Sequence, residues 1–221
     1  MRAGEIRQLA RRARIGPGMS VLDLCCGVGG PGRLVAAELG CRYLGVDYSL
    51  DALEIARDLA SDLRCHFEQM HLPPLPDERF EVVLLLETML AFPDKRALVE
   101  AVVGVLEPGG RFALTLEEGA PLTASEQARM PDADTVWLIE LDDWTRLLHE
   151  VGLKVTWEEE CTICHHATAT ALLQAFREDS AEVSQHVGSQ ALAELITAHE
   201  MWTGWLGGGR VRKFAQVVEK L

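Results

Sequence analysis

The chain lacks any apolar run long enough to cross a bilayer, and its start lacks the apolar stretch typical of a signal peptide. It is also poor in basic residues, with 21 Lys and Arg against 34 Asp and Glu and a formal net charge of −13. A surface this acidic repels phosphate backbones, which disfavours DNA and RNA as partners. We therefore expect a cytoplasmic protein, monomeric or homodimeric, with no membrane span and no nucleic-acid partner.

Disulfides are not needed either, although the chain contains six cysteines. A chain of 221 residues can bury a sufficient core without cross-links, so reduced thiols are expected. One spacing stands out, because Cys161, Cys164 and His165 form the C-x-x-C-H pattern of c-type haem attachment, which could also suit a metal. Haem attachment takes place outside the cytoplasm, so we interpret the spacing as chance and expect neither haem nor metal.

Short apolar runs alternate with helical patterns along the chain, which indicates an α/β fold. The expected strands are residues 21–24, 43–46, 65–68, 82–86, 111–116, 154–160 and 212–218. The expected helices are residues 3–14, 34–39, 49–63, 94–106, 122–130, 141–151 and 166–205, the last with a break near 179. Strands separated by helices need crossover connections, so we predict a seven-stranded, mostly parallel sheet with helices on both faces.

A glycine-rich turn follows the first expected strand, in the segment VLDLCCGVGGPG at residues 21–32. Gly27, Gly29 and Gly30 permit backbone geometry that is closed to other residues, and they let a ligand lie against bare backbone. The helix that begins there offers free N–H groups to a carboxylate or a phosphate. The spacing differs from the dinucleotide pattern G-x-G-x-x-G because Cys25 takes a glycine position.

Two acidic residues flank this turn. Asp23 lies inside the first strand, where it would repel a pyrophosphate but suits an ammonium group such as the methionine end of S-adenosylmethionine. Asp47 ends the second strand, about 20 residues beyond the glycines, which is the usual position for an acid that binds ribose hydroxyls. The order of strand, glycine turn, helix and acid is much more specific than the turn alone.

Three segments together resemble a known family. They are DLCCGVGG at residues 23–30, HLPPLPDERFEVVLLLETMLAFPDK at residues 71–95 and LEPGGRFALT at residues 106–115. They resemble class I S-adenosylmethionine-dependent methyltransferases of the small-molecule kind that includes the ubiquinone and menaquinone enzymes. The resemblance implies a Rossmann-like fold, S-adenosylmethionine as cofactor and S-adenosylhomocysteine as product. It also implies a single domain with an N-terminal helix (1–18), a cofactor-binding core (19–118), and substrate-side helices and last strands (119–221).

The resemblance also implies which residues contact the cofactor. They are Asp23, Cys25, Gly27, Gly29, Gly30, Asp47, Tyr48, Gln69, Met70 and Glu87. Asp47 would hold the ribose, Tyr48 would lie beside the adenine, and Glu87 would line the methyl-transfer pocket. Gln69 stands near a position where the family often has an acid, and its amide oxygen could accept the same hydrogen bond. Ala91 replaces a histidine that some relatives carry.

Residues that would contact the methyl acceptor are expected where strands four and five end, because ligands of open α/β sheets bind at the carboxyl ends of the strands. These residues are Thr88, Met89, Glu117 and Glu118, with Trp137, Trp202 and Trp205 as candidate walls that could equally be core. A base helps when the nucleophile arrives protonated. We hypothesise that His165 or His166 is that base, the alternative being an ordinary histidine at a helix start.

The resulting expectation is methyl transfer from S-adenosylmethionine to N, O or C of a small metabolite, with a lid formed by the N-terminus and by residues 120–205. Three alternatives stay open at this point. The same fold could catalyse a non-methylating step such as a cyclisation, or it could bind the cofactor without catalysis. Methylation of a protein or of tRNA is a third, although the acidic charge disfavours tRNA. No pattern in the sequence names the acceptor.

Overall fold

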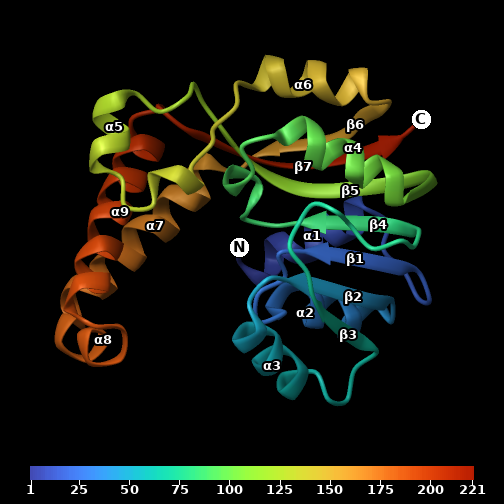
Figure 1. Cartoon of the computed structure of the whole chain (residues 1–221), viewed down its shortest axis with the longest axis horizontal. Helices are drawn as coiled ribbons and strands as arrows, with labels where there is room; N and C mark the ends of the chain where they lie inside the picture. The colour runs from blue at the N-terminus through green and yellow to red at the C-terminus, as the bar shows by residue number, and fades with distance from the viewer.

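A seven-stranded sheet forms the centre of the molecule in the computed structural model, which describes residues 1–221 (Figure 1). The strands lie in the order β3-β2-β1-β4-β5-β7-β6. Their bounds are β1 Ser20–Leu24, β2 Arg42–Asp47, β3 Cys65–Gln69, β4 Phe80–Leu85, β5 Leu106–Glu118, β6 Leu153–Glu160 and β7 Arg212–Lys220. β1 to β5 pair in parallel, and β7 is antiparallel to both β5 and β6. The predicted Rossmann-like, mostly parallel sheet is confirmed.

Five helices cover the two faces of the sheet. On one face lie α1 (Ala3–Arg12), α2 (Gly30–Leu39) and α3 (Leu50–Leu59), whose apolar residues join one core cluster. On the other face lie α4 (Lys95–Val105) and α6 (Leu141–Glu150), which contribute to a second cluster. Because both faces are covered, residues 82–85 of β4 are apolar and buried on both sides of the sheet, as is typical of a central parallel strand. α1 and α6 therefore belong mainly to the sheet and only marginally to the predicted lid.

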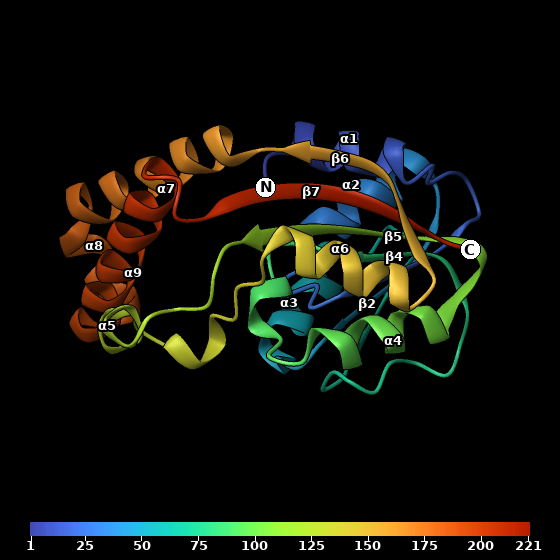
Figure 2. The same ribbon diagram turned by 90° about the horizontal axis from the view of Figure 1, so that it is seen from above.

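The remaining helices form a cap at the end of the sheet towards which the parallel strands run (Figures 1 and 2). We use "cap" for α5 (Ala124–Arg129), the short 3-10 helix η2 (Ala133–Thr135), α7 (Thr162–Glu178), α8 (Ser180–Val187) and α9 (Ser189–Gly207). A separate small core, which includes Met201 and Trp205, holds the cap together. None of the helices is long and apolar enough to span a membrane.

Several element boundaries differ from the expected ones, and α2 and α7 each begin four residues earlier than expected, at Gly30 and Thr162. The helix capped by Ser49 ends at Leu59, four residues before the expected end at residue 63. β5 begins at Leu106, five residues before the expected start at residue 111, and its pairing with β4 shifts in register before Arg111. The cap helices break at Asp179, as predicted, and again at Gly188, where a φ of 88° is one that glycine adopts readily.

Lys95 connects the cap to the core. Its side chain is buried, and Nζ donates to the carbonyl oxygens of Met89, Phe92 and Trp137 at 3.2, 2.9 and 2.6 Å. Met89 and Phe92 lie at the short 3-10 helix η1 (Met89–Ala91) after β4, whereas Trp137 lies just beyond η2. One ammonium group thus fixes the loop after β4 against the segment that leads out of the cap.

Candidate active site

The glycine-rich turn between β1 and α2 has the strained backbone that its sequence predicts. Cys25, Gly27 and Gly29 have φ values of 56°, 53° and 69°, in the left-handed region. A Cβ atom at Gly29 would lie 2.8 Å from the Phe67 ring, so a side chain is excluded there. α2 then starts at Gly30, which leaves the first backbone N–H groups of that helix without helical partners. A bare turn that leads into free N–H groups fits the carboxylate end of an amino-acid-like ligand.

Asp47 holds this turn to the sheet. Its Oδ2 accepts from the Gly27 N–H at 2.8 Å, and its Oδ1 accepts from the Ser49 N–H at 2.9 Å. Each carboxylate oxygen has a second lone pair, so ribose hydroxyls can still donate to the same group. Asp47 therefore orders the turn and the start of α3 while it remains able to bind a ribose.

Replacing Asp47 by asparagine is expected to weaken S-adenosylhomocysteine binding by about 10- to 100-fold, because an amide cannot accept at both positions and hydrogen bonds to charged groups contribute about 1.5–3 kcal/mol. Titration calorimetry measures the dissociation constant. Asp51→Asn is the matched control, since Asp51 is exposed in the first turn of α3. Equal affinities of the two variants would contradict this role of Asp47.

Asp23 is placed beneath the turn. It is 2% exposed, and the Tyr43 hydroxyl donates to its Oδ2 at 2.6 Å. Burial raises the pKa of Asp23 to about 7, which Tyr43 only partly offsets. One oxygen of Asp23 is thus occupied by the protein itself. Its predicted contact with the ammonium group stays a prediction.

The residues predicted to surround the adenine lie together at the ends of β2 and β3. Tyr48 is 68% exposed, and Gln69 Nε2 donates to its carbonyl oxygen at 3.0 Å. The Met70 N–H donates to the Asp47 carbonyl oxygen at 2.8 Å. The exposed ring and the neighbouring amide could enclose a flat aromatic group, and these contacts stay predictions.

Glu87 and Thr88 follow β4, the neighbour of β1 in the sheet. Glu87 has a φ of 64°, and its N–H donates to Thr115 Oγ1 at 2.7 Å. Thr88 Oγ1 is buried and has no hydrogen-bond partner within the protein. An unpaired buried hydroxyl is costly, so it is satisfied when a ligand or a water molecule occupies this end of the sheet. The residues present therefore fit a bound S-adenosylmethionine.

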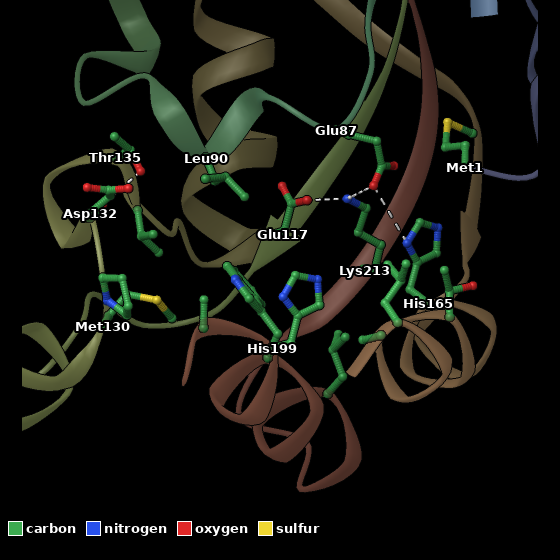
Figure 3. A pocket seen from close by; sticks show the side chains of 18 of the residues that line it. Met1, Glu87, Leu90, Glu117, Met130, Asp132, Thr135, His165, His199 and Lys213 are labelled. Carbon is green, nitrogen blue, oxygen red and sulfur yellow. Dashed lines mark hydrogen bonds and ion pairs between the residues drawn. The ribbon is translucent and has the colours of Figure 1, made fainter. Parts of the chain in front are cut away.

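A cavity of about 430 Å³ lies between the cap, the carboxyl ends of β4 and β5, and the amino end of β7, the antiparallel neighbour of β5 (Figure 3). Its apolar lining is Leu90, Met130, Val136, Leu172, Trp202 and Leu206. Its charged side is formed by Glu87, Glu117, His165 and Lys213, with Glu5 and Met1 contributed by the start of the chain. Because Glu87 belongs to this cavity as well as to the end of β4, we take the cavity as the candidate acceptor site.

Lys213 is the centre of the charged side. It is 3% exposed and contacts the carboxylates of Glu117 and Glu87, the latter at 3.2 Å. Burial by itself would lower the pKa of Lys213, but the two carboxylates hold it above its usual value. Burial would likewise raise the pKa of Glu87, yet Lys213 and His165 keep it below its usual value. The cavity wall thus contains fixed charges of both signs.

His165 completes this side of the cavity. Its Nδ1 lies 3.8 Å from Glu87 Oε2, and its Nε2 lies 3.9 Å from Glu5 Oε1. Nε2 is buried and has no hydrogen-bond partner. Burial lowers the pKa of His165 below its usual 6.5, although Glu87 acts in the opposite direction. The imidazole is therefore neutral near pH 7, and Nε2 is free to accept a proton.

Apart from the tryptophans, four predicted acceptor-side residues do not line the cavity, and Thr88, described above, is one of them. His166 packs against the end of α9, where a Cβ at Gly207 would lie 2.9 Å from its Nε2. Met89 is fully buried in the core. Glu118 pairs with Arg212 at 2.8 Å. Helical and strand periodicity explains these placements, because adjacent residues point in different directions.

The three candidate tryptophans differ in whether they line the cavity. Trp137 is 45% exposed, and its Nε1 donates to the Asp134 carbonyl oxygen at 2.7 Å, away from the cavity. Trp202 lines the cavity and packs edge-on against Trp205, which lies in the core of the cap. Trp202 therefore lines this cavity and Trp137 does not, and the predicted acceptor contact of Trp137 stays a prediction.

Lys213 is the cavity residue that the sequence reasoning missed, because no motif surrounds it. It is directly opposite Glu117 in the antiparallel pairing of β5 with β7. The available signal was a lysine near the start of the expected strand 212–218, at alternate positions shared with Ala215 and Val217. Around Cys161 and Cys164, by contrast, the structure assembles no group of three or more His, Cys, Asp or Glu side chains that could hold a metal ion.

Comparison with known proteins gives consistent matches. The methyltransferase-domain family matches residues 21–110. Methyltransferase GfsG from Streptomyces halstedii is 30% identical over 190 residues, which cover 79% of this chain and 67% of that protein. The 27-O-demethylrifamycin SV methyltransferase from Amycolatopsis mediterranei is 30% identical over 192 residues, covering 81% and 70%.

A solved structure shows the same fold. The phosphoethanolamine N-methyltransferase 2 of Haemonchus contortus, bound to phosphomonomethylethanolamine and S-adenosylhomocysteine, superposes with a TM-score of 0.84 at 18% identity. The match covers 98% of this chain and 52% of that one. At this identity the likeness concerns the fold alone, whereas the two sequence relatives establish the family. The chain belongs to the class I S-adenosylmethionine-dependent methyltransferases that act on small molecules.

Proposed function

We propose that this methyltransferase acts on an oxygen of a largely apolar, hydroxyl-bearing small molecule, and that His165 takes up the hydroxyl proton. The observation that carries this proposal is the neutral, largely buried imidazole of His165, whose Nε2 has no hydrogen-bond partner and which lines the cavity. A hydroxyl is a weak nucleophile until its proton is removed, so it benefits most from such a base. The name of the relative that acts on 27-O-demethylrifamycin SV is in line with an oxygen acceptor.

The charged neighbours of His165 support its role as a base. Protonation of Nε2 creates an imidazolium, and the carboxylates of Glu87 and Glu5 lie 3.8 and 3.9 Å from its two ring nitrogens. They stabilise the positive charge as it forms. Lys213 keeps Glu87 ionised for this purpose. S-adenosylmethionine, when bound, supplies an electrophilic methyl group on its sulfonium, so these side chains need only align and deprotonate the acceptor.

The cavity lining supports an apolar molecule and disfavours a nucleic acid. Leu90, Val136 and Trp202 would pack against a hydrocarbon frame. The net charge of −13 would repel a polyphosphate chain. The acceptor is therefore expected to be a molecule with few charges and at least one hydroxyl group.

A labelling experiment tests the proposal. The purified protein is incubated with S-adenosylmethionine carrying a ¹³C methyl group and with a panel of apolar alcohols and phenols, each paired with the corresponding amine. We expect ¹³C–O methyl signals in the products of the hydroxyl compounds. Label found only on nitrogen or carbon would overturn the oxygen assignment, and a cyclised product without label would favour the non-methylating alternative.

A further inference from the structure

One carboxylate oxygen of Glu117, in the acceptor cavity, has no hydrogen-bond donor. The residue is 6% exposed and lines the cavity. Its Oε1 contacts Lys213 Nζ, but its Oε2 is buried and has no hydrogen-bond partner. A buried carboxylate oxygen without a donor is unfavourable by about 1–3 kcal/mol or more. A ligand group that donates a hydrogen bond would remove this cost.

Lys213 offers the complementary feature. An ammonium group has three protons, and the protein supplies two acceptors for them, Glu117 and Glu87. Figure 3 shows Glu117, Lys213, Glu87 and His165 along one side of the cavity. A hydroxyl group both donates and accepts. It is therefore the simplest group that could satisfy Glu117 Oε2 and the remaining Lys213 proton together.

Stability alone does not account for this buried pair. A buried ion pair contributes little compared with apolar residues of similar volume, because both charges lose their hydration. Much of the rest of the cavity lining is apolar, including Leu90 and Leu206. Two aliphatic side chains in place of Glu117 and Lys213 would continue this apolar lining. Charged groups retained in a ligand cavity point to recognition.

We propose that Glu117, supported by Lys213, is a specificity-determining residue that binds a hydroxyl group of the acceptor other than the one that is methylated. This inference rests on the proposed function and narrows the substrate class to apolar molecules with two hydroxyl groups. His165 deprotonates one hydroxyl, and the Glu117–Lys213 pair holds the other. The second contact fixes the orientation of the frame on which the reacting oxygen sits.

The test compares binding of phenol and anisole, which differ by the hydroxyl proton and a methyl group, to protein saturated with S-adenosylhomocysteine. The background is His165→Ala, which removes the other hydroxyl acceptor under study. We expect this variant to bind phenol about 10-fold more tightly than anisole, the preference that a hydrogen bond to a charged group gives. In Glu117→Gln, with its amide oxygen towards Lys213, an N–H₂ group faces the ligand. The preference should then fall to about threefold or less, since anisole can only accept.

Two further variants make the outcome decisive. Glu118→Gln in the same background should keep the phenol preference, because Glu118 faces Arg212 and not the cavity. If Glu117→Gln unfolds, the combined change Glu117→Leu with Lys213→Met replaces the whole pair by apolar residues and should also abolish the preference. A phenol preference that survives Glu117→Gln, or that survives the double variant at positions 117 and 213, overturns the assignment. A His165→Ala protein that binds neither probe, or that binds both equally well, overturns it too. If the wild-type protein places no ¹³C methyl label on oxygen while the phenol preference is retained, only the proposed function is refuted.

Discussion

Replacing His165 by alanine is expected to lower kcat by about 100- to 10,000-fold, the range that general-base catalysis contributes. The affinity for S-adenosylhomocysteine should change by no more than about twofold, because His165 lies in the cap and the cavity that it lines includes no residue of the glycine-rich turn. Steady-state kinetics with the acceptor found by labelling, and calorimetry with S-adenosylhomocysteine, measure the two effects separately.

If His165 is the base, the activity should also depend on pH in a defined direction. Burial lowers the pKa of His165 below 6.5, so the neutral base form predominates at neutral pH and disappears as the pH falls through that lowered value. For the wild-type protein, kcat/KM should rise from acidic pH to a plateau, with a midpoint below that of an ordinary histidine. The His165→Ala variant should lose this rise.

His166→Ala is the matched control for His165. The two histidines are adjacent on α7, but His166 packs against the end of α9 and does not line the cavity. Its replacement should leave both kcat and the pH profile close to those of the wild-type protein. A large loss in His166→Ala, or a His165→Ala enzyme with the wild-type profile, would refute the assignment of the base.

Replacing Gly32 by alanine is the second change with a large expected effect. A Cβ at Gly32 would lie 2.0 Å from Tyr43 Cζ and 2.1 Å from its hydroxyl oxygen. Tyr43 is 1% exposed and donates to Asp23, so the ring cannot move aside without breaking that hydrogen bond. We expect a loss in the free energy of unfolding of about 2–4 kcal/mol, from overpacking and the disrupted buried bond.

Gly30→Ala provides the control within the same turn. No atom lies within 4 Å of a Cβ at Gly30, and this glycine does not have a positive φ. Its free energy of unfolding should change by no more than about 0.5 kcal/mol. Denaturant unfolding measures both variants, and equal stabilities would contradict the packing role of Gly32. Calorimetry on Gly30→Ala also tests whether S-adenosylhomocysteine lies against the backbone there.

Much of the cofactor side could be predicted from the sequence because its determinants are local. The run from β1 through the glycine-rich turn into α2 depends on neighbouring residues, with left-handed backbone at Gly27 and Gly29. Asp47 is found at the end of β2, where the predicted order of elements places it. All seven strands were located to within a few residues except β5, which starts five residues earlier than expected.

The acceptor side depended on contacts between residues that are distant in the chain. Glu117 and Lys213 are 96 residues apart and become direct neighbours only because β7 enters the sheet antiparallel to β5. Directly opposed residues of such a pair share one face of the sheet, so Glu117 with Lys213 and Glu118 with Arg212 form two pairs on opposite faces. The sequence alone could not distinguish these two glutamates.

His165 shows the same difference between what local sequence patterns predict and what contacts between distant residues decide. The sequence by itself determined the α/β fold, the methyl donor and two adjacent histidines as candidates for the base, because each follows from a short-range pattern. Only the tertiary structure places His165, and not His166, on the cavity wall, through the direction in which α7 packs against α9 and against β7. A side chain's environment depends on which helix face meets the sheet, and that is decided by packing over the whole cap.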